Sequence, residues 1–426
     1  MQDLNPRQRE AVRYLDGPLL VLAGAGTGKT RVITAKIAHL IQAAGVGAHH
    51  ITAVTFTNKA AREMKSRVAG LIDNSQSRGL TVSTFHTLGL NLLRRELAAS
   101  GLRAGFTILD EQDVEQLLAE LNKETRADKA RLQLARSRIS AWKNDLLTPD
   151  DALQQAQDQT DTFHALLYAA YQRALRAYNA VDFDDLIGLP VTLLREHPEL
   201  RERWQNRIRY LLVDEYQDTN SAQYELVRLL VGVRGALTVV GDDDQSIYAW
   251  RGARPENLAA LRTDFPQLRL IKLEQNYRST GRILRAANQL IANNEHVFDK
   301  RLWSELGPGD PLRVITCRDE EDEAERVTSE IVQQRFQTGQ AHRDFAILYR
   351  GNHQSRPFEK ALRAQGVPYF ISGGGSFFSR SEVKDIMAYL RLLANADDDS
   401  ALLRIINTPR REIGPGTLEK LAHYAA

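Results

Sequence analysis

The chain has 426 residues, a length that predicts two to four domains rather than a single core. Charged residues make up 26% and hydrophobic residues 43%, which is typical of soluble globular proteins. The formal net charge is only +2, so any affinity for nucleic acid must come from a local basic or aromatic groove.

Cysteine content and hydropathy indicate the compartment. The single cysteine, Cys317, excludes a disulfide framework and fits a reducing environment. The N-terminal "MQDLNPRQREAV" has no apolar signal core, and the longest strongly apolar stretch, residues 186–194, is too short to cross a bilayer. We therefore expect a cytoplasmic protein that has no membrane partner.

Five apolar runs end in polar residues: "LLVLAGAGTGKT", "ITAVTFTNK", "YLLVDEYQD", "LTVVGDDDQ" and "LIKLEQNYR". Runs of four to six residues rich in Val, Ile and Leu predict strands that are buried on both faces. Parallel α/β sheets bind ligands at the carboxyl ends of their strands. The pattern predicts an α/β fold with a nucleotide-binding parallel sheet.

Two other regions differ from this pattern. From about residue 86 to residue 190, segments such as "DVEQLLAELNKE" have helical periodicity and clear strand runs are lacking, which predicts a helical subdomain inserted into the first sheet. After Arg278, the runs at 312–317, 345–350 and 367–375 predict three strands of a second α/β unit. The last run ends in "GGG" (373–375), a plausible boundary, and the chain from Ser381 on reads as helical.

The segment "AGAGTGKT" predicts a phosphate-binding loop, because it follows an apolar run and precedes an amphipathic helix. Backbone N–H groups around the glycines and the helix N-terminus would hold phosphate oxygens. Lys29 would neutralise the outer phosphates and Thr30 would bind Mg²⁺. The strict pattern begins with Gly where this chain has Ala23, and the alternative is a glycine-rich turn without a ligand. The candidate nucleotide-binding residues here are Ala23, Gly24, Ala25, Gly26, Thr27, Gly28, Lys29 and Thr30.

An acidic pair follows the run "YLLV". Asp214 would hold Mg²⁺, and Glu215 would orient and deprotonate the attacking water. Alone, the pair is often only a solvated strand end. Together with a phosphate loop it predicts hydrolysis of a nucleoside triphosphate.

The stretch "GDDDQSIYAWRGA" places an amide, two aromatic rings and a cation after another strand. Gln245 would point toward the γ-phosphate of the nucleotide. Tyr248, Trp250 and Arg251 suit single-stranded nucleic acid, since stacking on bases is independent of sequence. The alternative makes both aromatic residues part of the core beneath a loop.

Two more strand ends carry aromatic residues beside polar or basic ones, and these favour the nucleic-acid interpretation. One supplies Phe56, Asn58 and Lys59, and the other supplies Phe85 and His86. A single track for one nucleic-acid strand would explain all three strand ends.

These motifs together resemble superfamily 1 DNA helicases of the Rep type (the Rep/UvrD/PcrA family). The similar strings run from "LNPRQREAV" to the C-terminus and include "AVTFTNKAAREMK", "STFHTLGL", "DFDDLI", "LLVDEYQDTN", "VVGDDDQSIYAWRGARPENL", "LEQNYRST" and "AILYRGNHQSR". The resemblance implies two RecA-like motor domains, ATP and Mg²⁺ as ligands, and DNA unwinding in the 3′ to 5′ direction. The protein would be a monomer or weak dimer, and its partners would be single-stranded DNA and duplex junctions.

The resemblance also implies roles for individual residues. Gln8 would read adenine, Tyr277 would stack on it, Arg31 would contact the nucleotide, and Arg278 would reach the γ-phosphate as an arginine finger does. The implied DNA contacts are Phe56, His86, Tyr248, Trp250 and Arg251, with Arg350 and Asn352 on the second motor domain.

The implied domains are residues 1–85 with 197–277 (first motor domain), 86–196 (helical insertion), 278–374 (start of the second motor domain) and 375–426 (start of another helical insertion). Strings similar to the family's last two motifs are not found, so the resemblance predicts a C-terminally truncated second motor domain. The alternatives are an ATP-gated module that binds single-stranded DNA without motor activity, and a P-loop enzyme acting on a small molecule.

Overall fold

The computed structural model describes residues 4–73, 75–122, 128–249, 252–254, 256–294, 298–372, 380–396 and 398–413, together with residues 417 and 420. The contacts divide the chain into two units, which are described separately: Met1–Asp310 with Asp397–Ser400, and Pro311–Ala396 with Ala401–Ala426.

A six-stranded parallel sheet forms the centre of the first unit, with strand order β3-β2-β6-β7-β1-β8. The five apolar runs all form strands of this sheet, as the sequence predicted. The strands are β1 (Leu19–Ala23), β2 (Ile51–Thr55), β3 (Thr81–Thr84), β6 (Tyr210–Val213), β7 (Leu237–Gly241) and β8 (Arg269–Leu273).

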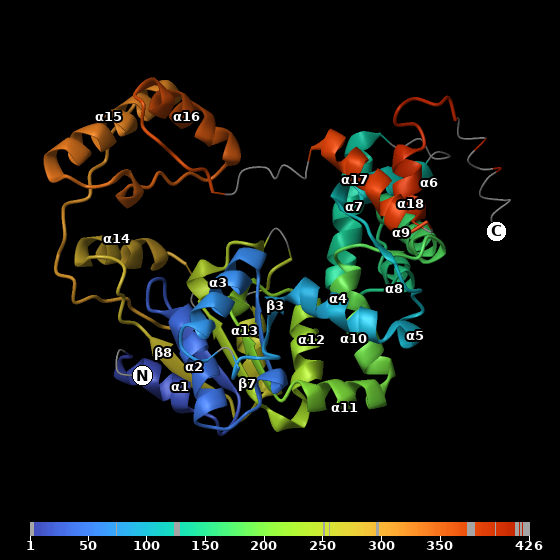
Figure 1. Cartoon of the computed structure of the whole chain (residues 1–426), viewed down its shortest axis with the longest axis horizontal. Helices are drawn as coiled ribbons and strands as arrows, with labels where there is room; N and C mark the ends of the chain where they lie inside the picture. The colour runs from blue at the N-terminus through green and yellow to red at the C-terminus, as the bar shows by residue number, and fades with distance from the viewer. Residues whose placement is uncertain are drawn as a thin grey trace. The chain divides into compact units, whose positions relative to one another are not determined.

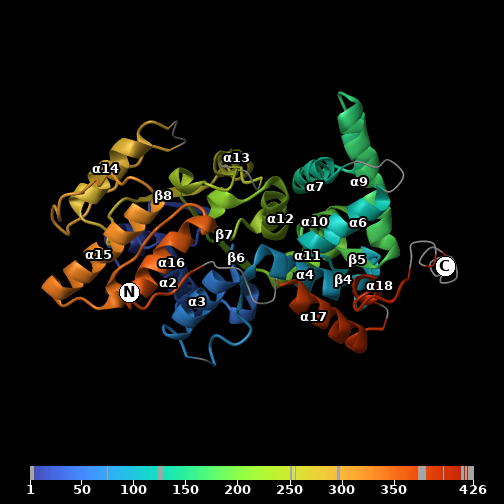
Figure 2. The same cartoon turned by 90° about the horizontal axis from the view of Figure 1, so that it is seen from above.

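Helices cover both faces of the sheet (Figures 1 and 2). On one face lie α1 (Pro6–Arg13), α2 (Lys29–Gln42) and α3 (Asn58–Ala69). On the other lie α4 (Phe85–Arg95), α10 (Asp185–Glu196), α11 (Pro198–Arg207), α12 (Ser221–Val231) and α13 (Glu256–Asp264). Alternate residues of β1 enter the two cores, with Leu20 and Leu22 in one and Val21 in the other. Burial on both faces explains why the run is continuously apolar.

The region between β3 and α10 is mainly helical and has a core of its own. A short parallel pair, β4 (Thr107–Ile108) and β5 (Ala180–Val181), also lies here and was not expected from the sequence. Two residues are too few to give a recognisable strand pattern. The remaining helices are α5 (Leu97–Ser100), α6 (Glu111–Leu121), α7 (Lys129–Asn144), α8 (Pro149–Gln154) and α9 (Gln159–Ala177).

The first unit continues through α14 (Gly281–Ile291) to Asp310. Residues 278–310, which the sequence assigned to the next domain, therefore cluster with the first sheet. They do so because the segment after α14 returns to β8, where the N–H of Trp303 donates to the carbonyl of Glu274 (3.1 Å). The predicted boundary between folding domains stays a prediction.

The described residues of the second unit do not form the three strands predicted for it. Among the described residues from 311 onward, the runs at 312–317, 345–350 and 367–372 are all irregular. Val314 is 97% exposed and Leu348 92% exposed, so these apolar residues have no neighbouring layer against which a sheet could form. The glycines at 373–375 lie outside the described residues. The helices after Asp310 are α15 (Glu320–Thr338), α16 (Ser355–Ala364), α17 (Ser381–Ala394) and α18 (Asp399–Ile405).

None of the described helices combines the length and the apolar character needed to cross a bilayer.

A matched pair of glycines tests the packing of α4 against α10. A Cβ on Gly89 would lie 1.8 Å from the carbonyl oxygen of Leu186, the carbonyl that Pro190 leaves without its usual helical N–H donor. We expect Gly89→Ala to lower the free energy of unfolding by about 1–3 kcal/mol or more. Gly188 on α10 has open space around it, so Gly188→Ala should be neutral or stabilise by up to about 1 kcal/mol. Urea unfolding of both variants measures this, and equal effects would contradict the close approach.

Candidate functional site

The loop between β1 and α2 has the backbone of an anion-binding turn. Gly26 and Gly28 have φ of 71° and 90°, values that side chains with a Cβ rarely adopt. The hydroxyl and the N–H of Thr27 both donate to the carbonyl of Gly24, at 2.8 and 3.3 Å. Gly28 precedes α2 without a side-chain cap, so the first N–H groups of the helix remain available to an anion.

Lys29 ties this loop to the acidic pair after β6. Its Nζ lies 2.8 Å from Oε2 of Glu215, within the same sheet edge. Glu215 has φ of 52°, a left-handed conformation that is uncommon outside glycine. Such strained backbone costs free energy and is concentrated at functional sites. The N–H of Glu215 donates to Oδ1 of Asp214 at 3.0 Å, which fixes the Asp214 carboxylate against the backbone of Glu215.

Asp214 is a buried carboxylate whose charge is poorly compensated. Burial and the neighbouring Glu215 carboxylate raise its pKa to about 7, and Lys29 offsets only part of this shift. A divalent cation would favour the ionised form, so the site fits Mg²⁺. Thr30, in the first turn of α2, supplies the hydroxyl that such an ion would need from the phosphate loop.

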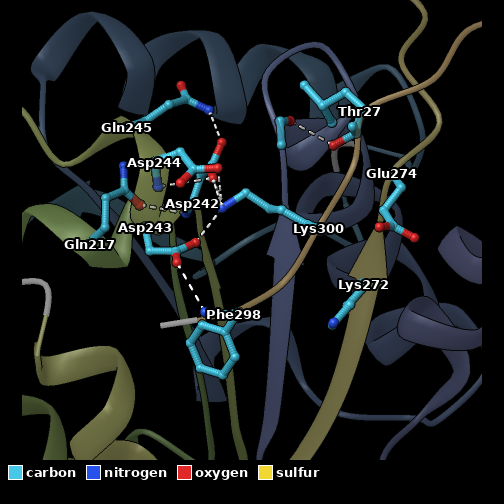
Figure 3. Close-up of polar contacts among 12 residues, drawn as sticks. Thr27, Gln217, Asp242, Asp243, Asp244, Gln245, Lys272, Glu274, Phe298 and Lys300 are labelled. Atoms are coloured by element: carbon cyan, nitrogen blue, oxygen red, sulfur yellow. Dashed lines mark hydrogen bonds and ion pairs between the residues drawn. The ribbon is translucent and has the colours of Figure 1, made fainter. Parts of the chain in front are cut away.

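A chain of polar contacts continues from Glu215 to the end of β7. Gln217 donates to Oε2 of Glu215 (2.9 Å), and its Oε1 accepts the N–H of Asp242 (3.0 Å). The Asp242 carboxylate in turn accepts a hydrogen bond from Nε2 of Gln245 (Figure 3). The structure thus links the predicted residues Lys29, Glu215 and Gln245. Gln217 was missed, although it stands in the "DEYQD" string.

The other side of the phosphate loop contacts the segment after β8. Buried Asn276 donates to the carbonyl of Ala25 (2.5 Å) and accepts the N–H groups of Arg278 (2.8 Å) and Ser279 (2.7 Å). The N–H of Tyr277 donates to the carbonyl of Gly26 (2.9 Å). Asn276, a residue in "QNYR" to which the sequence gave no role, therefore holds Arg278 beside the loop, and the backbone of Tyr277 binds the loop directly.

Gln8 and Tyr277, the two residues expected at adenine, are linked through Asn5. Asn5 Nδ2 donates to the hydroxyl of Tyr277 (2.8 Å), and Asn5 and Gln8 form a reciprocal helix cap. Gln8 is buried and donates to the carbonyl of Thr27 (2.8 Å). Arg31 lies in the first turn of α2.

A cavity of about 960 Å³ lies beside the acidic pair and extends toward the helical region. Its lining includes Phe56, His86 and Tyr248, which were predicted to contact nucleic acid, together with Glu215 and Gln245. It also includes Phe183, whose exposed ring meets His86 edge-on at 6.0 Å. Phe183 was missed because a lone aromatic residue in "DFDDLI" gives no separate signal.

Other predicted nucleic-acid contacts are placed differently. Phe85 is 2% exposed and packs against Phe56 in the core, so its ring is not available to a base; the strand-end pattern could not distinguish the inner from the outer aromatic residue. Asn58 and Lys59 are exposed in the first turn of α3. Trp250 and Arg251 lie outside the described residues. Arg350 and Asn352 are exposed in the second unit.

Comparison with known proteins identifies relatives over the whole chain. The model of the UvrD/REP helicase N-terminal domain matches residues 4–266, and that of the UvrD-like helicase C-terminal domain matches residues 271–426. The chain is 61% identical to the ATP-dependent DNA helicase Rep of Escherichia coli and of Salmonella typhimurium, over 99% of its own length and 63% of theirs. It is 44% identical to the ATP-dependent DNA helicase PcrA of Staphylococcus epidermidis, covering 58% of that protein. The chain thus spans less than two thirds of these relatives.

The raised pKa of Asp214 predicts a pH-dependent effect of Asp214→Asn without Mg²⁺ or nucleotide. The folded pKa of about 7 exceeds the ordinary value of 3.8, so the fold loses stability as pH rises through this interval. At pH 8 the variant should be more stable than the unchanged chain by on the order of 2–4 kcal/mol, at about 1.4 kcal/mol per pKa unit. At pH 5 the difference should shrink to less than half of its value at pH 8, and it should vanish only below the ordinary pKa of 3.8. Thermal unfolding at both pH values measures this, and a pH-independent difference would contradict the assignment.

Proposed function

The chain belongs to the UvrD/REP helicase family, and from this premise we propose that it is the ATP- and DNA-binding part of an ATP-dependent 3′–5′ DNA helicase. ATP·Mg²⁺ would bind at the phosphate loop, and single-stranded DNA would bind in the cavity beside Gln245. The observation that carries the proposal is the continuous polar chain from Lys29 through Glu215, Gln217 and Asp242 to Gln245.

The nucleotide would be held by backbone and charge. The N–H groups of residues 24–30 would surround the β- and γ-phosphates, and Lys29 would leave Glu215 to pair with phosphate oxygens. Tyr277 would stack on adenine, and Gln8 would read its edge after exchanging the hydrogen bond with Thr27. Arg31 would add a further phosphate or sugar contact.

Hydrolysis would use the acidic pair. Mg²⁺, held by Asp214 and Thr30, would neutralise charge on the β- and γ-phosphates. Once Lys29 has turned to phosphate, Glu215 would be released to orient the attacking water and accept its proton. Gln245 would contact the γ-phosphate, and Arg278, held by Asn276, would approach it from the opposite side of the loop.

DNA would lie against the aromatic residues of the cavity. Phe56, Phe183 and Tyr248 offer ring faces for stacking, which requires no particular base sequence. Gln245 and Tyr248 stand on the same short segment, so a shift of the amide toward or away from phosphate would move an aromatic contact with the strand. Arg350 and Asn352 would add contacts from the second motor domain. The domain boundaries implied by the family are part of this proposal.

ATP hydrolysis by the 426-residue chain, with and without single-stranded DNA, tests the proposal. We expect ATP hydrolysis that DNA stimulates. In Lys29→Ala the rate of hydrolysis should fall by about 100-fold or more, because the variant lacks the charge that stabilises the transition state. DNA binding without turnover would leave a nucleotide-gated DNA-binding module as the function of this chain. Turnover that is indifferent to DNA would favour a small-molecule P-loop enzyme.

Tyr248→Ala tests the DNA path separately. Loss of one stacking ring should weaken binding of an oligo(dT) strand by about 1–3 kcal/mol, measured by fluorescence anisotropy. The matched control is Phe336→Ala, which removes a 92% exposed ring on α15 that does not line the cavity. Equal losses in both variants would contradict a specific track.

A further inference from the structure

Three consecutive carboxylates after β7 surround one lysine side chain (Figure 3). Nζ of Lys300 lies 2.6 Å from Asp242 and 2.8 Å from Asp244, and it also pairs with Asp243. The Lys300 side chain is only 4% exposed, and those of Asp242 and Asp243 are similarly buried. Carboxylate oxygens of the three aspartates lie within 4.8 Å of one another, close enough to hold a metal ion. Here the ammonium group occupies their centre.

Such a cluster needs its cation. Buried like charges destabilise one another, and removal of one partner from a buried ion pair leaves uncompensated charge. Burial acts to lower the pKa of Lys300, but the carboxylates, Asp242 first among them, outweigh it and raise the pKa. Lys300 therefore stays charged over the pH range in which the enzyme would work.

The segment that carries Lys300 connects the carboxylates to the nucleotide loop. At its start, the N–H of Phe298 donates to Oδ2 of Asp243 (3.3 Å). At its end, the carbonyl of Trp303 accepts the N–H of Asn276 (2.7 Å). Between them, the side chain of Leu302 covers Gly24 so closely that a Cβ there would lie 2.3 Å from Cδ2. One segment thus contacts the ends of β7 and β8 on either side of the phosphate loop, and Gly24 within the loop.

We propose that Lys300 is a positioning residue for Gln245. It neutralises and fixes Asp242, whose other carboxylate oxygen accepts the hydrogen bond from Gln245 and whose N–H donates to Gln217. Lys300 itself need not touch the nucleotide. Through Asp242 it holds the amide in the orientation from which the amide reaches the γ-phosphate.

The catalytic part of this inference rests on the proposed function, but the structural part does not. Lys300→Met keeps the length of the side chain and removes the charge. Asp244, the most exposed of the three carboxylates, should then turn to water, and Asp242 should lose its fixed position. The backbone from 242 to 249 should open more often.

Hydrogen–deuterium exchange of the whole chain without nucleotide tests the structural part. We expect exchange of residues 242–249 in Lys300→Met to become faster by about tenfold or more, with α6 to α9 unchanged. The control is Lys272→Met, because Lys272 donates to the carbonyl of Asp299 on the same segment but does not pair with the three aspartates. Unchanged exchange in Lys300→Met, or the same increase in both variants, would overturn the inference.

Steady-state ATP hydrolysis with saturating single-stranded DNA tests the catalytic part. We expect kcat of Lys300→Met to fall by about 10- to 100-fold while KM for ATP changes less than about threefold, because ground-state binding is left to the phosphate loop. Lys300→Arg should recover part of the loss. If Lys300 acts through Gln245, adding Lys300→Met to Gln245→Ala should reduce kcat no further. Additive losses would overturn the positioning role.

Two controls keep the outcomes distinct. If Lys300→Met does not melt cooperatively, the triple variant Lys300→Met/Asp243→Asn/Asp244→Asn removes the repulsion but leaves Asp242 without its cation. It should fold and still exchange rapidly over 242–249; slow exchange like that of the unchanged chain would overturn the inference. If the unchanged chain itself does not hydrolyse ATP, the proposed function fails for this chain, and the exchange measurement alone decides the role of Lys300.

Discussion

The parallel run of all six strands is the constraint on which the site depends. Because every strand of the main sheet points the same way, their carboxyl ends meet at one edge, and polar residues that are far apart in sequence become neighbours there. The position of β1 between β7 and β8 determines which segments lie beside the phosphate loop: the "GDDDQ" segment on one side and the "QNYR" segment on the other. The backbone N–H groups of the strands are used in hydrogen bonds between strands, so only the loops at this edge have N–H groups available to a ligand.

Lysines with little exposed surface then join segments that the sheet alone would leave independent. Lys29 binds the phosphate loop to the end of β6, and Lys300 binds the segment after α14 to the end of β7. In the helical region, Lys143 does the same between α7 and the start of α10, where its Nζ lies 2.6 Å from Asp182 and 2.8 Å from Asp185. A buried ammonium group is costly unless carboxylates surround it, so each lysine fixes the segments that supply its partners.

The sequence was sufficient for the first sheet, and it placed most residues of the candidate nucleotide site at the edge of that sheet. Strands buried on both faces give continuous apolar runs, and motif residues such as Lys29 and Asp214 follow them directly. It was insufficient where a role depends on contacts between distant segments. Lys300, Asn276 and Gln217 act through partners that no local pattern reveals, and Phe85 and Phe56 differ only in which of them faces the core. The strands predicted after Asp310 are wrong for a related reason. Residues typical of strands form one only where another strand is present to pair with it, and Val314 and Leu348 are exposed.

The two acidic clusters at this sheet edge differ in what completes them. The carboxylates of Asp242, Asp243 and Asp244 already surround an internal cation, which makes them a fixed structural joint. Asp214 has no comparable partner: its raised pKa shows that Lys29, already paired with Glu215, compensates it only in part. A ligand that brings its own cation would therefore be drawn to Asp214 and not to the triplet. Its phosphates would also compete with Glu215 for Lys29. Binding of a metal–nucleotide complex would thus satisfy Asp214 and free Glu215 in the same event, so the proposed general base would become available only when a phosphate is bound.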